Sequence, residues 1–284
     1  MPDRLDTELV RRGLVRSRRH ARVAVEEGRV TVDGRQAQKA STPIDQTSDL
    51  TVRPDAEDPA YASRGGCKLA GALDVLDPLV VSGRRCLDAG ASAGGFTDVL
   101  LRRGARTVVA LDVGHGQLVA DLRQDPRVVV RERTSVRGLV PEQIGGLVDL
   151  VVADLSFISL TTVLPSLVRL VDEGSPSGDL LLLVKPQFEV GRARLGRGGV
   201  VRDPALRALA VTGVARAAES LGLAVAAVTV SPLTGPAGNV EYFVWLRTGA
   251  SSSSRRWTEV EAERLVSGAA RTLWLSLPGE RLWP

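Results

Sequence analysis

Between residues 67 and 248 the sequence alternates short apolar runs with stretches whose apolar residues recur at helical spacing. Short buried strands that alternate with helices indicate a parallel sheet with helices packed on both faces. The longest runs, such as 180–184, are far shorter than the ~18–20 apolar residues of a membrane helix. The sequence therefore predicts a doubly wound α/β domain. Its candidate strands are residues 85–88, 107–112, 128–132, 147–154, 179–185, 224–231 and 242–246.

Changes in composition divide the chain into further parts. Residues 55–66 (DAEDPAYASRGG) are acidic and then carry proline and glycine, which is typical of a linker. The serine-rich run GASSSSRR after Thr248 indicates a second flexible connection. We therefore expect a small unit over 1–54, the α/β domain over 67–248, and a tail over 249–284. Apolar residues from Leu265 to Leu277 recur at helical spacing, so the sequence predicts a helix in this tail.

The composition excludes several classes of protein. Hydrophobic residues make up 44% of the chain and charged residues 25%, which is an ordinary globular balance. The start MPDRLDTELV has no apolar signal-peptide core. Cys67 and Cys86 are the two cysteines, and His20 and His115 are the two histidines. Neither cysteine therefore has other metal ligands near it in the sequence. We expect a soluble, cytoplasmic protein without a metal site, a disulfide framework or a membrane segment.

The N-terminal unit combines helical and hairpin signals with a strongly basic stretch. A first helix ends near Gly13, a second begins at the N-cap Ser17 and ends at Gly28, and Asp33-Gly34 is a two-residue hairpin signal. Six arginines and no acid lie between residues 11 and 22. A basic surface of this kind favours phosphate binding, although a solvated helix face is the alternative.

The run RLDTELVRRGLVRSRRHARVAVEEGRVTVDGRQAQKAS resembles the small RNA-binding domain named after ribosomal protein S4. The resemblance rests on the glycine, Ser-Arg and Val-x-Val-x-Gly spacings. In that family the helix that begins at the Ser-Arg pair, here Ser17-Arg18, lies on structured RNA, and the module does no chemistry. The resemblance implies a small α+β RNA-binding domain, with RNA contacts from Arg4, Arg11, Arg18, Arg19 and Arg22.

A glycine-rich turn joins the first strand of the α/β domain to a helix, in the run RRCLDAGASAGGFTDVLL. The nicotinamide fingerprint G-x-G-x-x-G aligns on Gly90, Ser92 and Gly95, so its second glycine is missing. Asp88 at the strand end favours a ligand with an ammonium and a sulfonium, such as S-adenosylmethionine, over a dianionic one. Asp112 closes the second strand about 20 residues after Gly90, the usual spacing for an acid that binds ribose hydroxyls. A purely structural turn is the alternative.

Four charged residues converge on one edge of the expected sheet. Asp154 ends the fourth strand, Lys185 ends the fifth, and Glu241 opens the last. Lys68 lies just before the first helix of the domain, where it can fold over the site. The chain has three lysines among its 37 basic residues, so two lysines at one sheet edge are conspicuous. For any one of these residues alone, a surface charge near a loop is the alternative.

Lys68, Asp154, Lys185 and Glu241 resemble the Lys-Asp-Lys-Glu tetrad of the FtsJ-like ribose 2′-O-methyltransferases. The chain is most similar to the TlyA family, through the runs DAGASAGGFTDVLL, VVADLSFISL, LVKPQFEVG and GNVEYF. That family, whose members are sometimes labelled haemolysins, joins an S4-like domain to a Rossmann-like class I methyltransferase domain with a seven-stranded sheet. We expect neither a signal peptide nor a membrane span in this sequence, and this argues against a pore-forming haemolysin.

The TlyA resemblance implies S-adenosylmethionine as cofactor and cytidine ribose hydroxyls in ribosomal RNA, within 30S or 50S subunits or both, as substrate. Family members often carry an amide after the third strand, where this chain has Ser135 in ERTSV. The cofactor-binding residues that it implies are Asp88, Gly90, Ala91, Ser92, Gly94, Gly95, Phe96, Asp112, Ser135 and Asp154.

The chemistry of the reaction supports a role for each member of the tetrad. A ribose hydroxyl is a poor nucleophile until its proton leaves. Lys185 is the candidate base or hydroxyl-orienting group, and Lys68 is the neighbouring positive charge that favours a neutral Lys185. Asp154 then positions Lys185, and Glu241 orients Lys68 or the hydroxyl.

Two further features leave alternatives open. Arg192 and Arg194 follow Lys185 in a glycine-rich stretch that either holds RNA phosphates or is a solvated loop. Phe157 either stacks on a base or packs locally. Base N-methylation is a second possible activity, since such sites often have Asp/Asn-Pro-Pro-aromatic where this chain has Asp154-Leu-Ser-Phe157. A non-catalytic RNA-binding factor in ribosome assembly is a third.

Overall fold

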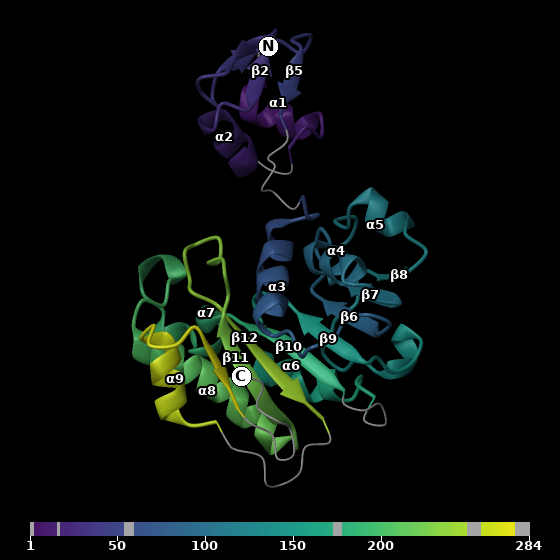
Figure 1. The fold of residues 1–284 in the computed structure, drawn as a ribbon, viewed down its shortest axis with the longest axis vertical. Helices are drawn as coiled ribbons and strands as arrows, with labels where there is room; N and C mark the ends of the chain where they lie inside the picture. Colours follow the sequence, from purple (N-terminus) through teal and green to yellow (C-terminus); the bar gives the residue numbers. More distant parts are fainter. Residues whose placement is uncertain (1–2, 16–17, 54–59, 173–177, 249–256, 276–284) are drawn as a thin grey trace. The chain divides into compact units, whose positions relative to one another are not determined.

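The structure is a computed structural model that describes residues 3–15, 18–53, 60–172, 178–248 and 257–275, without the side chains of Arg19, His20 and Arg197. The chain divides into two compact units, Met1–Ser63 and Arg64–Pro284 (Figure 1). The expected N-cap at Ser17 and the serine-rich connection 249–256 lie outside the described residues.

The small unit packs two helices against short antiparallel strands. Its elements are β1 (Asp3–Arg4), α1 (Leu5–Arg11), α2 (Arg18–Glu26), β2 (Val30–Val32), β3 (Arg35–Gln36), β4 (Pro43–Ile44) and β5 (Leu50–Val52). The strands pair in the orders β3-β2-β5 and β1-β4. Asp33 and Gly34 have φ of 50° and 75°, the conformation of a type I′ turn, so the hairpin expected there is confirmed.

The large unit is built on an eight-stranded sheet (Figure 1). Its strands are β6 (Arg85–Ala89), β7 (Thr107–Leu111), β8 (Val128–Arg131), β9 (Leu150–Ala153), β10 (Asp179–Val184), β11 (Ala224–Val230), β12 (Tyr242–Arg247) and β13 (Thr272–Trp274). Its helices are α3 (Arg64–Val75), α4 (Gly95–Arg102), α5 (Ala120–Gln124), α6 (Leu160–Val168), α7 (Pro186–Glu189), α8 (Pro204–Ser220) and α9 (Glu259–Val266).

The strand order places a switch point at the centre of this sheet. The order is β13-β11-β12-β10-β9-β6-β7-β8, in which β10, β9, β6, β7 and β8 pair in parallel and β12 runs antiparallel to β10 and β11. From β6 the chain adds β7 and β8 on one side, and then crosses to add β9 and β10 on the other side, so the strand order reverses between β6 and β9. In open α/β sheets a ligand binds outside the carboxyl ends of the strands at such a point.

The seven strands expected from the sequence are confirmed. The largest difference in their bounds is at β9, which begins at Leu150 rather than at residue 147. Val148 instead forms an isolated bridge with Val171, and the Asp149 side chain accepts the backbone N–H of Arg85. Val148 therefore pairs with Val171, and regular pairing with β6 and β10 begins at Leu150.

Helices cover both faces of the sheet, as the doubly wound prediction requires. Successive side chains of a strand point to opposite faces. Leu87 of β6 joins Val151 of β9 in a continuous apolar core with residues of α6, α8 and α9. Its neighbour Asp88 points to the other face, where it meets Thr97 of α4.

The tail differs from its predicted form. The helical spacing from Leu265 to Leu277 predicts one helix, but α9 ends at Val266 and β13 follows. Gly268, with φ of 80°, ends the helix in the left-handed region. β13 then pairs antiparallel with β11, and the backbone N–H of Leu275 donates to Ala226. Pairing with an open sheet edge satisfies the backbone groups of this segment and adds an eighth strand to the seven expected.

Candidate active site

The glycine-rich turn after β6 lies directly against the end of β9. Gly90 has φ of 91°, and a Cβ built on it would lie 2.7 Å from the backbone oxygen of Asp154. Any other residue would therefore be strained in conformation and would collide with backbone. The close approach brings the turn and the carboxyl end of β9 together at the switch point.

Asp88 is buried beneath this turn. It is 0% exposed, and its Oδ2 accepts a hydrogen bond of 2.6 Å from Oγ1 of Thr97. Its Oδ1 is buried without a hydrogen-bond partner among the described residues. Burial raises the pKa of Asp88 to about 7, and the negative charges of Asp154 and Asp112 act in the same direction.

Asp112 follows β7 and is held by two backbone groups. One carboxylate oxygen accepts from the N–H of Ser92 at 2.8 Å, and the other accepts from Gly114 at 2.6 Å. Ser92 has φ of 47°, which turns its amide toward this carboxylate. Each carboxylate oxygen has a second lone pair, so the fixed carboxylate can still accept ribose hydroxyls. Val113, beside it, is 73% exposed.

This arrangement fits a cationic, ribose-bearing cofactor. The orphaned Oδ1 of Asp88 lacks a donor, and an ammonium group would supply one and favour the ionised carboxylate. Asp112 offers ribose contacts on the neighbouring strand. The donor set therefore fits S-adenosylmethionine better than a pyrophosphate, which two carboxylates would repel.

The remaining cofactor candidates lie in the turn, in the first residues of α4 and in the loop after β8, where the N–H of Thr134 donates to the backbone oxygen of Asp112. Ala91 and Gly94 are in the turn, and Gly95 and Phe96 begin α4. The Phe96 ring lies 6.0 Å from that of Phe243, so its packing is accounted for within the domain. Ser135 is exposed in the loop after β8, where its Oγ accepts from the N–H of Arg137.

Lys68 and Glu241 form a buried ion pair. Lys68 lies inside α3 rather than before the first helix of the domain, and its Nζ is 2.5 Å from Oε2 of Glu241, which immediately precedes β12. The two residues are 7% and 1% exposed. Burying an ammonium group is costly unless a carboxylate compensates it, so each residue requires the other.

Lys185 and Asp154 form a second pair. Nζ of Lys185, at the end of β10, lies 2.6 Å from Oδ1 of Asp154 and donates a hydrogen bond of 2.8 Å to Oγ of Ser156. Lys185 is 8% exposed. The tetrad is thus organised as two lysine–carboxylate pairs, and Ser156 is a polar partner that the sequence analysis did not identify.

Phe157 is the most exposed apolar side chain at this edge. It is 92% exposed and has φ of 65°, in the left-handed region that disfavours residues other than glycine. Its ring lies 5.3 Å from that of Phe188, whose own ring is 6.0 Å from Nζ of Lys185. Local packing therefore uses one side of the ring and leaves most of its surface to solvent.

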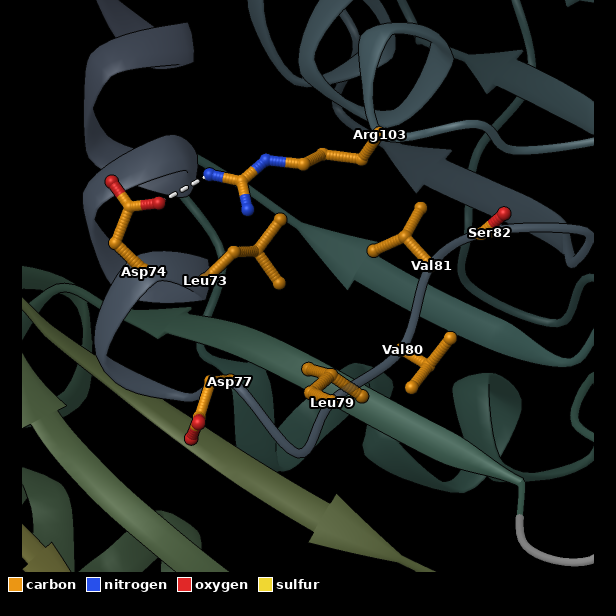
Figure 2. Close-up of a pocket in the computed structure, with 8 residues that line it drawn as sticks. All are labelled: Leu73, Asp74, Asp77, Leu79, Val80, Val81, Ser82 and Arg103. Atoms are coloured by element: carbon orange, nitrogen blue, oxygen red, sulfur yellow. Dashed lines mark hydrogen bonds and ion pairs between the residues drawn. The ribbon is translucent and has the colours of Figure 1, made fainter.

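The described cavities lie away from the tetrad. One of about 340 Å³ is lined by residues at the end of α3 and before β6, and an Arg103–Asp74 ion pair closes one side of it (Figure 2). Arg103 caps the carboxyl end of α4, so this cavity is at the opposite edge of the sheet from the glycine-rich turn. A second, of about 410 Å³, lies between α8 and α9.

In the small unit, two buried carboxylates organise four of the arginines. Asp6 is 0% exposed and pairs with Arg4 at 2.9 Å and with Arg18 at 3.3 Å. A hydrogen bond from Arg4, reinforced by Arg18, lowers the pKa of Asp6 to about 2. The side chains of Arg4 and Arg18 remain 49% and 59% exposed. They can therefore reach a phosphate while Asp6 holds them.

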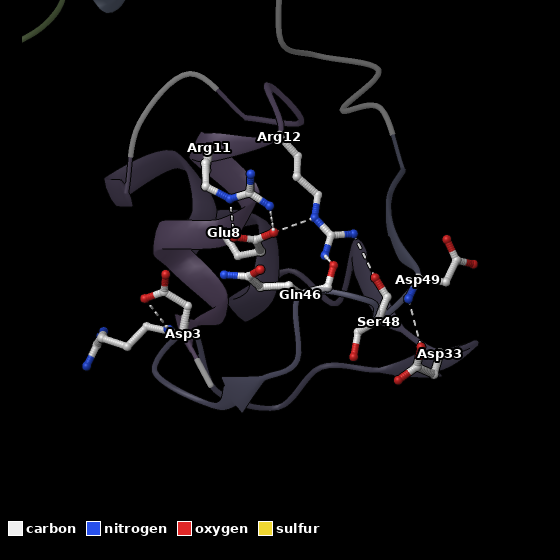
Figure 3. A network of polar contacts seen from close by, with 9 residues as sticks. Asp3, Glu8, Arg11, Arg12, Asp33, Gln46, Ser48 and Asp49 are labelled. Carbon is white, nitrogen blue, oxygen red and sulfur yellow. Dashed lines mark hydrogen bonds and ion pairs between the residues drawn. The ribbon is translucent and has the colours of Figure 1, made fainter. Parts of the chain in front are cut away.

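Glu8 organises the second group (Figure 3). Arg11 and Arg12 both donate to its carboxylate, and Arg12 also donates to the backbone oxygens of Gln46 and Ser48. Hydrogen bonds from Arg11 and Arg12 lower the pKa of Glu8 to about 2. The sequence analysis placed the acids outside the basic stretch and therefore missed that Asp6 and Glu8 compensate part of its charge.

The other RNA-binding candidates are distributed over both units. Arg22 is exposed on α2, and the side chain of Arg19 lies outside the description. Arg192 and Arg194 are exposed in a short 3₁₀ turn after α7. Among the described residues, Arg22, Arg192 and Arg194 have no ion-pair partner.

Two polar residues near the tetrad, Glu189 and Asn239, were not among the candidates predicted from the sequence. Glu189 accepts from Oγ of Ser159 at 2.5 Å and from the N–H of Leu160 at 2.8 Å, so it caps α6 from the end of α7. Asn239 is 1% exposed and binds the backbone 38 and 40 residues away. Asn239 is the sole asparagine in the chain, and this could have drawn attention to it in the sequence.

Metal-ligand clusters and membrane-spanning helices are both absent from the described part of the chain. No group of three histidine, cysteine or acidic side chains there could hold a metal ion. No helix there combines the length and apolarity needed to span a bilayer.

Comparison with known proteins gives two family matches. The model described as FtsJ-like methyltransferase matches residues 61–248, and the S4 domain model matches residues 3–50. The first match contains all four tetrad residues and the glycine-rich turn. The second contains Asp6 and Glu8 with their arginines.

Individual relatives extend over nearly the whole chain. The 16S/23S rRNA (cytidine-2′-O)-methyltransferase TlyA of Mycobacterium tuberculosis is 60% identical over 93% of this chain and 97% of that protein. Hemolysin A of Brachyspira hyodysenteriae is 36% identical over 84% of this chain and 97% of its own. A solved structure from Streptococcus thermophilus that carries a hemolysin name has a TM-score of 0.74 at 36% identity, covering 95% of this chain and 96% of that one.

Proposed function

Because the chain belongs to the FtsJ-like methyltransferase family, we propose that it methylates the 2′-hydroxyl of cytidine in ribosomal RNA. The pairing of Lys185 with Asp154 and Ser156 beside the glycine-rich turn is the observation that carries the proposal. The catalytic domain begins with α3 at Arg64, three residues before the predicted residue 67, and extends to residue 248, and residues 1–54 are an S4-like RNA-binding domain. The substrate is the 30S subunit, the 50S subunit or both, in the cytoplasm.

The cofactor is S-adenosylmethionine, held at the carboxyl ends of β6 and β7. When bound, it supplies a sulfonium methyl group that is already strongly electrophilic. Asp88 lies beneath the turn with a carboxylate oxygen that lacks a donor, which suits the ammonium group of the cofactor. Asp112 is fixed by Ser92 and Gly114 and holds the ribose hydroxyls.

The two ion pairs divide the catalytic work on the RNA hydroxyl. Lys185 orients the ribose 2′-hydroxyl and, in its uncharged amine form, receives the hydroxyl proton, while Asp154 and Ser156 hold the lysine side chain in place. Lys68 and Glu241 form a second fixed charge pair beside the hydroxyl. General-base assistance contributes about 10²–10⁴-fold, whereas alignment of the reacting groups contributes about 7–11 kcal/mol. Positioning is therefore the larger contribution of these residues.

The RNA is bound by arginines in both units. Arg4, Arg11, Arg18, Arg19 and Arg22 form the basic surface of the S4-like domain, and Arg192 and Arg194 bind phosphates beside the catalytic site. The exposed ring of Phe157, which packs against the Phe188 ring near Lys185, offers a surface on which a base can stack.

Transfer of labelled methyl groups from S-adenosylmethionine to unmodified bacterial 30S and 50S subunits tests this proposal. We expect label on at least one subunit with the wild-type protein, and none with Lys185→Ala. Arg169→Ala, an exposed arginine after α6, is the control and should retain full activity. If neither subunit is labelled by a protein that binds S-adenosylmethionine, the proposed substrate is wrong and a non-catalytic role in ribosome assembly is favoured.

A further inference from the structure

The one asparagine of the chain is buried and fully used. Oδ1 of Asn239 accepts a hydrogen bond of 2.8 Å from the N–H of Val201, and Nδ2 donates one of 3.0 Å to the backbone oxygen of Gly199. Its own backbone oxygen accepts from the N–H of Gly235 at 2.9 Å. A side-chain amide that uses its donor and its acceptor on one distant segment fixes that segment in two directions. We call these two side-chain bonds the Asn239 clamp.

The clamp acts at one end of an exposed loop, residues 191–200, which we call the basic loop. Val201, at its end, is 2% exposed, and Arg207 of α8 donates to its backbone oxygen at 2.9 Å. Val190, at its beginning, is 7% exposed and follows α7. The loop therefore leaves the domain and returns to it through two buried valines, and Asn239 and Arg207 hold the returning end.

The basic loop presents uncompensated positive charge. The sequence of the loop, from residue 191 to residue 200, contains three arginines and no acid. Arg192 and Arg194 are exposed, and neither has an ion-pair partner among the described residues. Guanidinium groups in this state are available for bidentate hydrogen bonds to phosphate.

The clamp also touches the segment that carries a tetrad residue. Glu241 is two residues after Asn239, and a Cβ built on Gly235 would lie 2.4 Å from Oε1 of Glu241. The turn from Gly235 to Asn239 therefore packs against the Lys68–Glu241 pair on one side and holds the basic loop on the other. A closely packed turn transmits a displacement of either partner, because it has no space to absorb one.

We propose that Asn239 is a positioning residue, which sets the basic loop against the Lys68–Glu241 pair so that phosphates of the substrate RNA are held in register with the catalytic site. The inference rests on the proposed function and deepens it, since it assigns an RNA-binding loop to the catalytic domain and a device that fixes it. RNA is the expected partner because the loop offers guanidinium groups and no acid beside a site for a ribose hydroxyl.

Two measurements that need no turnover test the clamp and the loop separately. Trypsin cleaves after arginine, so the cleavage rate after Arg192 and Arg194 reports how firmly the loop is held. Loss of two hydrogen bonds in Asn239→Ala should raise this rate about tenfold. Kd for unmodified subunits should rise by the same factor in Asn239→Ala as in the double variant Arg192→Ala/Arg194→Ala. Kd for S-adenosylmethionine should stay unchanged in all of them.

Combining the variants gives the sharper test. If Asn239 acts through the basic loop, adding Asn239→Ala to Arg192→Ala/Arg194→Ala should cause no further loss of subunit affinity. Arg169→Ala is the control for a general loss of positive charge. Should Asn239→Ala fail to fold, Arg207→Lys loosens Val201 from the other side, and the same two measurements apply.

The outcomes distinguish the inference from the proposed function. Unchanged trypsin cleavage in a folded, cofactor-binding Asn239→Ala protein overturns the clamp. Faster cleavage with wild-type subunit affinity overturns the RNA-binding role of the loop, even when methyl transfer proceeds normally. Absence of methyl transfer by the wild-type protein contradicts the proposed function instead, and it leaves the cleavage rate and the affinity measurable.

Discussion

Two of the three lysines of this chain are the buried amines of its candidate site. Lys68 and Lys185 are 7% and 8% exposed, and each forms an ion pair with a different carboxylate. Lysine can give up its proton and arginine cannot, so a chain that otherwise uses arginine for positive charge has kept lysine where proton transfer is proposed. The fixed pairs also mean that substituting one partner leaves the other charge buried and uncompensated.

Lys185→Arg should keep the positive charge but lose most of the activity. Arginine can pair with Asp154, but it cannot accept a proton from the ribose hydroxyl, so we expect the rate of methyl transfer to fall at least about 100-fold. Single-turnover methyl transfer to the substrate subunit measures this loss. Turnover near that of the wild-type protein would show that Lys185 only orients the hydroxyl.

Asp88 should make cofactor binding depend on pH. Burial raises its pKa to about 7, and the positively charged cofactor favours its ionised form. The affinity for S-adenosylmethionine should therefore fall up to about tenfold per pH unit below 7 and level off above it. Calorimetric titration between pH 6 and pH 8 measures this, and Asp88→Asn should remove most of the dependence. A wild-type affinity that does not change over this range would contradict the role of Asp88.

The same group should affect stability with the opposite sign. Because the folded-state pKa of Asp88 is above the ordinary value of about 3.9, ionisation opposes folding of the cofactor-free protein. The stability that Asp88 contributes is complete below about pH 4 and is lost as the pH rises through about 7. Asp88→Asn should therefore gain stability relative to the wild-type protein as the pH rises over this interval.

Among the secondary-structure elements, α6 and α7 are joined by a single carboxylate. Glu189, at the end of α7, caps the N-terminus of α6 through Ser159 and Leu160. α6 follows the segment that carries Asp154, and α7 follows Lys185 directly. Glu189 therefore ties together the two segments on which the Lys185–Asp154 pair depends.

Glu189→Ala should lower both stability and activity. The N-cap residue of α6 is Ser159, and Glu189 adds two accepted hydrogen bonds at this helix end, whose loss costs about 1–2 kcal/mol of unfolding free energy. Thermal or urea unfolding would measure this loss. The matched control is Thr258→Ala, which removes the N-cap of α9 away from the tetrad. Both variants should lose comparable stability, but only Glu189→Ala should lower kcat. Equal kcat values would mean that Glu189 has no more than a local structural role.

The elements show what could be predicted from the sequence. Apolar runs between turns gave the strands of the large sheet, because burial of a strand on both faces is a local and continuous pattern. The helix predicted for the end of the tail was wrong, since β13 forms there by pairing with β11, which is distant in the sequence. Residue types likewise predicted the four members of the tetrad. The roles predicted for the carboxylates already coupled Asp154 to Lys185 and Glu241 to Lys68. Ser156 as a further partner of Lys185 could not be predicted, because the turn after β9 meets the end of β10 only in the folded domain.

At the scale of the whole molecule, some arginines stabilise the fold through hydrogen bonds, and others present positive charge to solvent. Arg12 is largely enclosed by Glu8 and two backbone oxygens, whereas Arg22 is exposed and has no ion-pair partner among the described residues. The net charge of +4 therefore understates how much positive charge particular surfaces offer to RNA.

Arg22→Ala and Arg12→Ala should separate these two uses. We expect Arg22→Ala to weaken subunit binding without changing the melting temperature, and to reduce the slope of log Kd against log salt by about 1. Arg12→Ala should instead lower the melting temperature, because Glu8 loses part of its compensation. Binding measured over a range of salt concentrations, with unfolding curves for both variants, tests this. The same effect from both substitutions would contradict the distinction.

The central claim is that the methyl group is placed on a ribose hydroxyl of cytidine. Its most direct test is mass spectrometry of nucleosides from subunits treated with the protein and isotopically labelled S-adenosylmethionine. The account predicts labelled 2′-O-methylcytidine, absent after treatment with Lys185→Ala. Label on a cytosine ring, or on the base of another nucleoside, would contradict the account and identify the protein as a base methyltransferase.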